Sequence, residues 1–313
     1  MELPLPPHWD PARVEEIRRV PYEQRAVEAT AWADEHGLTP AHEDARRVAL
    51  LLVDCQNTFC TPGFELFVPG APEDSRRLCE FVYRNLGAIT QIIPTLDTHR
   101  AMQVFHAAWL VDAKGRHPQP YTVVSAYEVE RGIWHAADPE EQGNLERYVR
   151  GLAERGRYRL TVWPYHAMLG GIGHALVSAV EEAVFFHSIA RTSLAAFQVK
   201  GENPRVEHYS VLGPEVGGGR NDALIELLSS FEAVVIAGQA KSHCVAWTVE
   251  DLLQDVPADR VYLLEDCTSP VVAAGAVDFT AAGNEAFARF AARGVHVLDS
   301  TRPIDSWPRG RNP

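Results

Sequence analysis

The chain lacks the features of several large classes of protein. Its 313 residues contain no stretch near the roughly 18 consecutive apolar residues that a membrane-spanning helix needs. Basic side chains are scarce, since 29 Lys and Arg stand against 42 Asp and Glu and give a formal net charge of −13, which disfavours binding to nucleic acid or to an anionic membrane. The first seven residues have neither a basic start nor the apolar core of a secretory signal. We therefore expect a cytoplasmic protein without nucleic-acid or membrane partners.

Cysteine is also rare, with five residues in the whole chain. The number is odd, and the spacing resembles neither a disulfide framework nor a zinc ribbon. This pattern is typical of a protein that resides in a reducing compartment. The five are Cys55, Cys60, Cys79, Cys244 and Cys267.

The sequence does contain several short apolar runs that are typical of buried strands. Val48–Val53 is continuously apolar, and residues 231–238 and 195–199 are similar. Further strand candidates alternate with helix-like stretches, and this alternation predicts an α/β fold with a parallel sheet covered by helices on both faces. The further strand candidates are residues 89–96, 159–162, 260–264 and 296–298, and the helical ones are residues 75–86, 173–188, 222–230, 245–254 and 273–293.

The chain is longer than one such sheet requires, and the surplus lies in two segments. Residues 1–46 form an N-terminal extension whose residues 11–36 are helix-like and rich in Glu and Arg. We expect one hydrolase-sized domain at residues 47–313, with an insertion at about residues 108–159. The insertion is interpreted as a subdomain or lid beside the sheet edge, or as a plain surface elaboration.

Three of the predicted strands end in residues that can act together in catalysis. Asp54, Lys200 and Cys244 follow the runs that end at residues 53, 199 and 238. The carboxyl ends of parallel strands meet at one edge, where α/β proteins bind ligands. A thiol at a strand-to-helix turn is placed where helix N–H groups favour a thiolate and can hold an oxyanion. Each residue taken alone also has a structural explanation. Asp54 could cap a helix, Lys200 could be a solvated strand end, and Cys244 could be a small buried hydrophobic residue.

Several short motifs around these residues carry a family resemblance. The chain resembles the isochorismatase-like cysteine hydrolases, and within them the nicotinamidases, over roughly residues 47–107 and 160–300. The motifs follow the family's order, and the resemblance implies a Rossmann-like parallel sheet with helices on both faces. They are Asp54-Cys-Gln-Asn-Thr-Phe59, Val68-Pro-Gly-Ala71, Leu96-Asp-Thr-His99, Trp163-Pro-Tyr-His166, Lys200-Gly-Glu-Asn203, Tyr209-Ser210 and Gly238-Gln-Ala-Lys-Ser-His-Cys-Val245.

The resemblance implies a catalytic mechanism. Cys244 attacks an amide carbon and forms a thioester, Asp54 accepts and returns protons, and Lys200 stabilises the charged forms. Backbone N–H groups of Ala240 and Cys244 form the oxyanion hole, and relatives have a cis peptide at the position of residues 239–240. His243 is a rival base, but neighbouring residues at a helix start do not face each other.

A metal site is the second expectation. Asp97 and His99 are two residues apart at a strand end, so their side chains point to the same side. The resemblance adds His166 as the third ligand and implies that the ion holds the substrate's ring nitrogen. A carboxylate and two imidazoles suit zinc, with manganese or iron as alternatives; otherwise the three are loop and core residues. We treat the histidines without such context as structural or surface residues, namely His106, His117, His135, His174 and His187.

Three aromatic residues lie within the matched motifs. The resemblance implies that Phe59, Trp163 and Tyr209 form the flat walls of a pocket for a ring-shaped substrate, while core packing is the alternative. The chain departs from the nicotinamidase pattern at Ala167, where cysteine is usual, and at residues 241–242, where Thr-Asp is usual. These departures leave the substrate more open than the chemistry.

The sequence thus predicts a nicotinamidase-like amidohydrolase that converts a small aromatic amide to its acid and ammonia. Hydrolysis of another amide or of a carbamoyl compound is an alternative within the same chemistry. Two alternatives of other classes are a non-haem iron oxygenase, since two histidines and a carboxylate also bind iron, and a non-catalytic interaction protein. Assembly as a homo-oligomer is possible.

Overall fold

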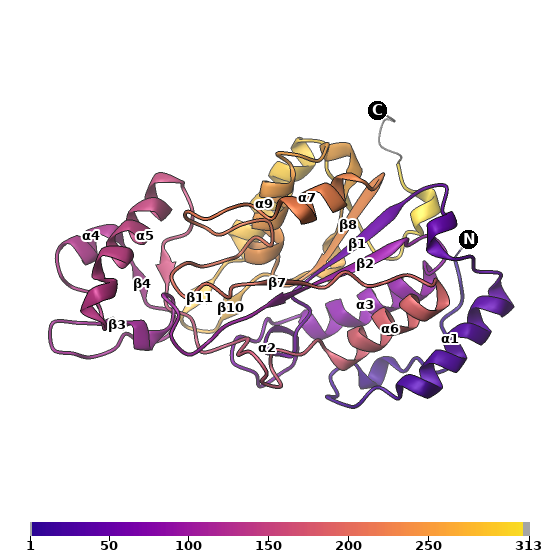
Figure 1. Ribbon diagram of the computed structural model, residues 1–313, viewed down its shortest axis with the longest axis horizontal. Coiled ribbons are helices and arrows are strands. Elements are labelled where there is room, and N and C mark those ends of the chain that lie inside the picture. The colour runs from indigo at the N-terminus through magenta and orange to yellow at the C-terminus, as the bar shows by residue number, and fades with distance from the viewer. Residues whose placement is uncertain (1, 309–313) are drawn as a thin grey trace.

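A six-stranded parallel sheet forms the centre of the computed structural model, which describes residues 2–308 (Figure 1). The strands lie in the order β12-β9-β8-β1-β2-β7, and each neighbouring pair is parallel. This arrangement confirms the predicted α/β class. The strands are β1 (Val48–Val53), β2 (Gln91–Asp97), β7 (Gln198–Lys200), β8 (Ala233–Gly238), β9 (Val261–Leu264) and β12 (His296–Leu298).

The two central strands are buried along their whole length. All six residues of β1 and all six of β8 are buried, which explains why both sequences are continuously apolar instead of alternating. Their register pairs Val53 with Gly238, and the register of β2 with β7 pairs Asp97 with Lys200. The carboxyl ends of these four strands are therefore level, and the residues that follow them come together.

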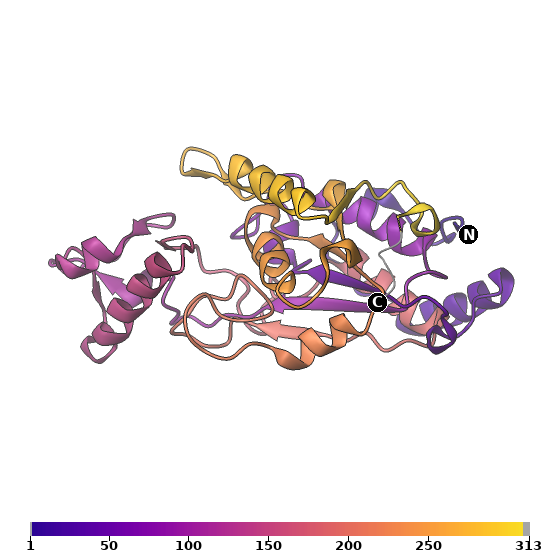
Figure 2. The ribbon, with the colours of Figure 1, turned by 90° about the horizontal axis from the view of Figure 1, so that it is seen from above.

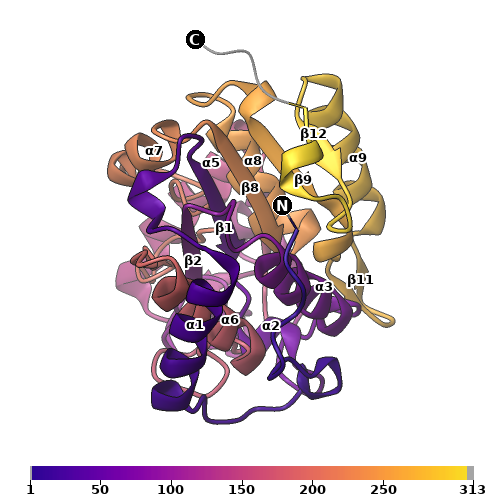
Figure 3. The ribbon, with the colours of Figure 1, turned by 90° about the vertical axis from the view of Figure 1, so that its right-hand side faces the viewer.

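Helices cover both faces of the sheet. α3 and α6 pack together on one face, with α1 outside α6, while α7, α8 and α9 lie on the other (Figures 1 and 3). No helix within residues 2–308 is both long and apolar enough to cross a membrane. The helices are α1 (Tyr22–His36), α2 (Asn57–Cys60), α3 (Ala71–Arg84), α6 (Ser178–Ala190), α7 (Asp222–Ser229), α8 (Ala246–Leu252) and α9 (Thr280–Ala292).

The N-terminal extension is packed against the sheet domain. Its helix α1 contacts α6, and a buried ion pair joins the two, with Arg25 Nε 2.8 Å from Glu182 Oε1. Arg18, ahead of the helix, also pairs with Glu182, and Leu3 N donates to Arg84 O at 2.8 Å. Because the acidic partner of both arginines lies in α6, the extension completes the cover of this face.

The insertion forms a lobe beyond the carboxyl end of the sheet (Figure 2). Two short antiparallel pairs and two helices build it. The segment expected as a sheet strand at residues 159–162 belongs here, because it pairs with β4 and not with the central sheet. The elements are β3 (Leu110–Val111), β4 (Val123–Val124), α4 (Ala126–Glu130), β5 (His135–Ala136), α5 (Gln142–Glu154) and β6 (Leu160–Thr161).

A second difference from the sequence prediction lies before the last helix. The helix expected over residues 273–293 begins only at Thr280, and the residues ahead of it form a hairpin of β10 (Val272–Ala273) and β11 (Val277–Asp278). Alanine-rich sequence favours a helix, but Gly275 adopts a left-handed φ of 77° at the turn. The hairpin brings Val271 and Phe279 together, since Phe279 N donates to Val271 O at 3.0 Å.

Several polar contacts fix the inserted lobe to the sheet domain. Tyr158 Oη donates to Ser242 O at 3.0 Å, in the turn that carries Cys244. Arg157 Nη2 lies 2.9 Å from Asp251 Oδ1, Arg157 Nε lies 3.4 Å from Glu215 Oε2, and the guanidinium stacks over Trp247 at 4.1 Å. The lobe is thereby held against both α8 and the chain that follows β7.

Gly238 generates the first test. It ends β8 with φ 113°, and a Cβ there would lie 2.1 Å from Val53 O. We expect Gly238→Ala to lower the free energy of unfolding by more than about 3 kcal/mol, since the two central strands would have to separate. Gly115→Ala is the matched control, because its φ of +74° is also left-handed but no atom lies within 4 Å; it should cost about 1–2 kcal/mol. Equal losses in denaturant titrations would contradict this account.

Glu215 generates the second. Burial raises the pKa of Glu215 to about 7, from an ordinary value of 4.5. The folded state then holds this proton more tightly than the unfolded chain does. The free energy of unfolding therefore falls as the pH rises from 4.5 to about 7, and this carboxyl group accounts for up to about 3 kcal/mol of the fall. Glu215→Gln should remove this fall, so the variant should gain stability over the wild type between pH 5 and pH 8. Chemical unfolding across that range tests it, with exposed Glu154→Gln as the control; a parallel pH dependence of both variants would refute it.

Candidate active site

The three predicted catalytic side chains meet at the carboxyl edge of the sheet. Lys200 Nζ lies 2.9 Å from Asp54 Oδ2 and 3.6 Å from Cys244 Sγ. All three residues are buried, with exposed fractions of 0% for Asp54, 4% for Lys200 and 7% for Cys244. The other four cysteines are buried free thiols as well, so what sets Cys244 apart is its contact with the ammonium.

Contacts with the surrounding chain hold Asp54 and Lys200 in place. Asp54 has a left-handed φ of 46° at the end of β1, its amide donates to Thr95 Oγ1 at 3.0 Å, and the same hydroxyl donates back to its carboxylate. Lys200 donates to His208 O at 2.9 Å and pairs with Asp97 Oδ1 at 2.9 Å. The ammonium therefore lies between two carboxylates, with the thiol beside it.

Burial and charge act in opposite directions on these groups. Burial works to lower the pKa of Lys200, but Asp54 and Asp97 outweigh it and hold the pKa well above its ordinary value. Burial raises the pKa of Asp54 against the attraction of Lys200, and it raises the pKa of the Cys244 thiol well above its usual range. At neutral pH the lysine is thus charged and the thiol keeps its proton, with a carboxyl group nearby to receive it.

Cys244, the predicted nucleophile, lies in a wide first turn ahead of α8. Residues Lys241–Val245 form this turn with π-helical hydrogen bonds, and the preceding Gln239–Ala240 peptide is cis, as the sequence resemblance implied. Gln239 Nε2 donates to Asp74 Oδ2 at 3.0 Å. Ala240 and Cys244, the predicted oxyanion-hole residues, line the same cavity.

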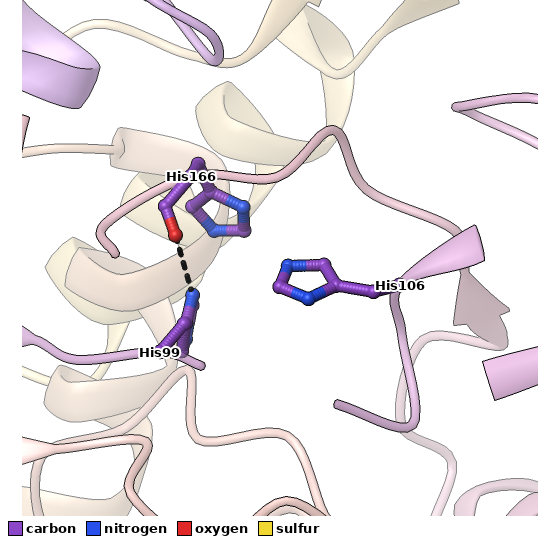
Figure 4. Close-up of side chains that lie close together, drawn as sticks. All are labelled: His99, His106 and His166. Atoms are coloured by element: carbon purple, nitrogen blue, oxygen red, sulfur yellow. Dashed lines mark hydrogen bonds between the residues drawn. The ribbon is translucent and has the colours of Figure 1, made fainter. Parts of the chain in front are cut away.

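A histidine cluster lies beside the trio. Possible ligand atoms of His99, His106 and His166 all lie within 4.8 Å of one another, and all three residues are buried. Figure 4 shows the three rings around a common space, with the hydrogen bond from His99 to the carbonyl of His166. Asp97 borders the group, since Asp97 Oδ1 lies 3.1 Å from His99 Nε2 and Asp97 Oδ2 lies 3.8 Å from His166 Nε2.

The tautomers of the three rings suit a cation. Each Nδ1 contacts a backbone carbonyl, at 3.2 Å for His99, 3.2 Å for His106 and 2.7 Å for His166. A carbonyl oxygen can only accept, so each Nδ1 carries the hydrogen and each Nε2 of the neutral ring has a lone pair. Within the described residues, Nε2 of His99 and of His106 are buried without a hydrogen-bond partner. Three lone pairs and a carboxylate facing one space repel each other unless a cation lies between them, so these residues fit a divalent metal ion.

His106 corrects the sequence analysis, which treated it as structural or surface. It is fully buried and belongs to the cluster. The chain turns back over residues 99–106, so that His106 forms a β-bridge with Trp163 while His99 forms one with Met168. The local sequence pattern does not predict this turn. A signal was available in the density of ligand types, because Asp97, His99 and His106 fall within ten residues.

The cavity next to Cys244 has aromatic walls. Phe59, Trp163 and Tyr209 line it as predicted, together with Leu66 and Val271. Trp163 Nε1 donates to Tyr209 Oη at 3.1 Å, which fixes the two rings against each other. Phe59 meets His166 edge to face, with ring centroids 5.6 Å apart. The cavity therefore places flat apolar surfaces between the histidine cluster and the thiol.

Two polar residues of this cavity were not among the predicted site residues. Glu207 lines it, and the amide of this residue donates to Tyr148 Oη of the inserted lobe at 3.1 Å. His243 also lines it, beside Cys244. Burial raises the pKa of Glu207 well above its ordinary value and lowers the pKa of His243 to about 3. Burial therefore disfavours the charged form of both side chains.

The other four histidines of the prediction lie outside the cluster. His187 Nε2 contacts Ile89 O at 2.8 Å in the core, and His117 Nδ1 contacts Leu110 O at 2.7 Å in the inserted lobe. His135 lies in β5 of that lobe. His174 contacts Thr98 Oγ1 at 2.8 Å, next to His99. These contacts suit structural roles.

The cluster predicts a measurable metal affinity. Chain stripped with a chelator should bind about one zinc ion, and His106→Ala should weaken the binding at least tenfold, because one of the facing lone pairs is lost. Calorimetric titration with zinc, together with metal analysis of the purified chain, measures both. His117→Ala, which removes an imidazole from the inserted lobe, is the control and should bind as the wild type does. Unchanged affinity in His106→Ala would remove this residue from the ligand set.

Comparison with known proteins places this site in context. No family model matches the sequence. The nicotinamidase of Escherichia coli K12 is 27% identical over 211 residues, which cover 66% of this chain and 76% of that protein.

Among solved structures, a nicotinamidase/pyrazinamidase of Acinetobacter baumannii gives a TM-score of 0.57 at 19% identity, covering 83% of this chain and 99% of that one. The yeast nicotinamidase gives 0.56 at 19% identity, with 80% and 99% covered. A Leishmania infantum relative in complex with nicotinate gives 0.54 at 20% identity, with 83% and 96% covered.

These similarities agree with the resemblance inferred from the sequence. The solved structures share the fold of this chain, and the sequence relative is a nicotinamidase. The predicted enzyme class, a hydrolase of carbon–nitrogen bonds, agrees with the activity named for the sequence relative. The chain has the isochorismatase-like fold and resembles the nicotinamidases.

Proposed function

We propose that this chain is a cysteine amidohydrolase of the nicotinamidase type, which converts a small aromatic amide to its acid and ammonia. One observation carries the proposal: Cys244 Sγ lies 3.6 Å from Lys200 Nζ, which is itself 2.9 Å from Asp54, and the thiol opens onto a cavity lined by Trp163 and Tyr209. Hydrolysis of an amide needs a nucleophile, a proton acceptor and a place for the ring. Cys244 and the aromatic rings line the cavity, and Asp54 is connected to the thiol through the ammonium of Lys200.

The reaction begins with the transfer of the Cys244 proton to Asp54 as the sulfur attacks the amide carbon. The new bond is sulfur to carbon, and the carbonyl oxygen takes the negative charge. Asp54 then returns the proton to the leaving nitrogen, which departs as ammonia and leaves a thioester. Water attacks the thioester, Asp54 takes one of its protons, and the Cys244 thiol is regenerated as the acid leaves.

Two features of the site lower the barrier to these steps. Lys200 keeps its charge because two carboxylates surround it, and it stabilises the thiolate while Asp54 is protonated. The amides of Ala240 and Cys244, which both line the cavity, are the donors assigned to the oxyanion. Such donors contribute about 3–4 kcal/mol each to lowering the barrier in other hydrolases.

Asp97, His99, His106 and His166 would hold a divalent metal ion, and the imidazole and carboxylate donors favour zinc, with manganese or iron as alternatives. When bound, the ion would supply Lewis-acid binding of a ring nitrogen. Solved relatives contain nicotinate or the inhibitor nicotinaldehyde, which supports a small aromatic ligand for this pocket. We propose no nucleic-acid or membrane partner, a cytoplasmic location, and possible assembly as a homo-oligomer.

Ammonia release tests the function directly. The wild type should release ammonia from nicotinamide, while Cys244→Ala and Asp54→Asn should lose at least about a thousandfold in kcat/KM, because each removes a group that forms or breaks a bond. Cys79→Ala, which removes a buried thiol in α3, is the matched control and should keep its rate. Chelation should lower the wild-type rate.

Two results would contradict the proposal. Full activity of Cys244→Ala would exclude the thiol as the nucleophile. Failure of the wild type to release ammonia from nicotinamide or from any larger aromatic amide, with Cys244 open to alkylation and the metal bound, would exclude the aromatic amidase reaction. Turnover that depends on oxygen and survives the loss of Cys244 would favour the oxygenase.

A further inference from the structure

His243 is a polar residue of the pocket that the proposed reaction does not use. The residue lines the cavity next to Cys244 and is 3% exposed. Its Nδ1 lies 2.9 Å from Ser242 Oγ. Its Nε2 is buried, and within residues 2–308 it has no hydrogen-bond partner. A buried polar atom left without a partner destabilises the folded state, so its presence beside a ligand cavity calls for an explanation.

The hydrogen bonds of Ser242 decide which nitrogen of His243 carries the hydrogen. The amide of Val271 donates to Ser242 Oγ at 3.1 Å, so this hydroxyl already accepts one hydrogen bond. The hydroxyl hydrogen needs an acceptor, and the partner that the described chain offers it is His243 Nδ1. Ser242 therefore donates to Nδ1. The imidazole is neutral, because burial lowers its pKa to about 3, so its single hydrogen is on Nε2.

The surroundings of His243 do not supply an acceptor for this hydrogen. Four aromatic rings enclose the imidazole, with centroids 4.9 Å away for Tyr158, 5.4 Å for Trp163, 5.1 Å for Tyr209 and 4.5 Å for Phe279. The hydroxyl of Tyr158 donates to Ser242 O, and the hydroxyl of Tyr209 accepts from Trp163. The N–H is thus a buried donor in an apolar cage. Trp163 and Tyr209 belong both to this cage and to the cavity walls.

We propose that the Nε2–H of His243 donates a hydrogen bond to the substrate and selects a ring amide that carries a second acceptor. This inference rests on the proposed amidohydrolase function. Nicotinamide has one ring nitrogen, and the metal site would take it, so nothing on its ring is left for His243. The favoured substrates are uncharged heteroaromatic amides with a further ring nitrogen, or with a ring hydroxyl or oxo oxygen. His243 thereby acts as a specificity residue.

Paired substrates measure the selection. The probes are nicotinamide, which lacks the second acceptor, and pyrazinamide with the ring-hydroxylated nicotinamides, which have it. In the wild type at least one acceptor-bearing amide should exceed nicotinamide by about tenfold to a hundredfold in kcat/KM, the range expected for one buried hydrogen bond. His243→Phe keeps the ring shape without the donor, so this ratio should fall to near one. His243→Gln restores an N–H near the same place and should recover part of the ratio.

Ser242 is a positioning residue in this scheme, because it fixes the tautomer without lining the cavity. Nitrogen NMR of the labelled chain should show His243 with its hydrogen on Nε2 in the wild type. In Ser242→Ala the hydrogen should shift partly to Nδ1, and the substrate ratio should fall with it. Loss of packing alone would move neither the NMR signature nor the ratio. A wild-type hydrogen on Nδ1 would overturn the inference.

A binding assay separates this inference from the proposed reaction. In a Cys244→Ala background, calorimetry measures the dissociation constants of nicotinamide and of the acceptor-bearing amides. Their ratio gives the substrate preference without turnover. Selective binding that His243→Phe abolishes, without turnover in the wild type, would support the role of His243 and reject the reaction. Turnover with equal ratios in the wild type and in His243→Phe would keep the reaction and show that the N–H only packs on the Phe279 ring. Absence of binding by every probe would reject both.

His243→Phe could also fail to fold, since it changes a fully enclosed side chain. Thermal unfolding of each variant shows whether this occurs. In that case His243→Gln and Ser242→Ala provide the test, because Gln is similar in size to His and Ala is smaller than Ser. An unchanged substrate ratio in these two variants would overturn the inference.

Discussion

The buried ammonium of Lys200 is the contact on which the site depends. It lies 2.9 Å from a carboxylate oxygen of Asp54 and 2.9 Å from one of Asp97, so the proposed proton acceptor and the acid beside the histidines share one cation. The charge of Asp54 in particular depends on it, since an unpaired buried charge costs several kcal/mol. The register of β2 with β7, which pairs Asp97 with Lys200, supplies this contact through backbone geometry. The proposed catalytic and metal-binding groups are therefore assembled at the same sheet edge.

The sequence predicted these elements because its signals are local and one rule joins them. Continuous apolar runs mark β1 and β8, a polar residue follows each strand, and parallel strands bring those residues to one edge. The same reasoning failed where the outcome depends on a partner in space. The strand at residues 159–162 pairs with β4, the hairpin before α9 pairs with itself, and His106 reaches the cluster through a turn. Local composition does not specify such partners.

The polar lining of the pocket shows the same limit at the level of single side chains. The prediction set His243 aside because neighbours at a helix start do not face each other, and the pairing of the ammonium with Asp54 and Cys244 leaves it no part in the proton transfer. The wide turn at Lys241–Val245 nevertheless lets both Cys244 and His243 line the cavity. Glu207 reaches the cavity from the chain after β7, where its amide is bound by Tyr148. Periodicity rules for regular helices do not extend to such segments.

The inserted lobe contacts residues in and around the pocket. Tyr158 binds the carbonyl of Ser242 and packs its ring against His243, and Tyr148 binds the amide of Glu207. These contacts support His243 and Glu207, which line the cavity, and not the proposed reacting side chains. The sheet edge thus carries the proposed reacting groups, while the lobe supports residues that surround the ligand, so the two parts of the chain can be altered separately.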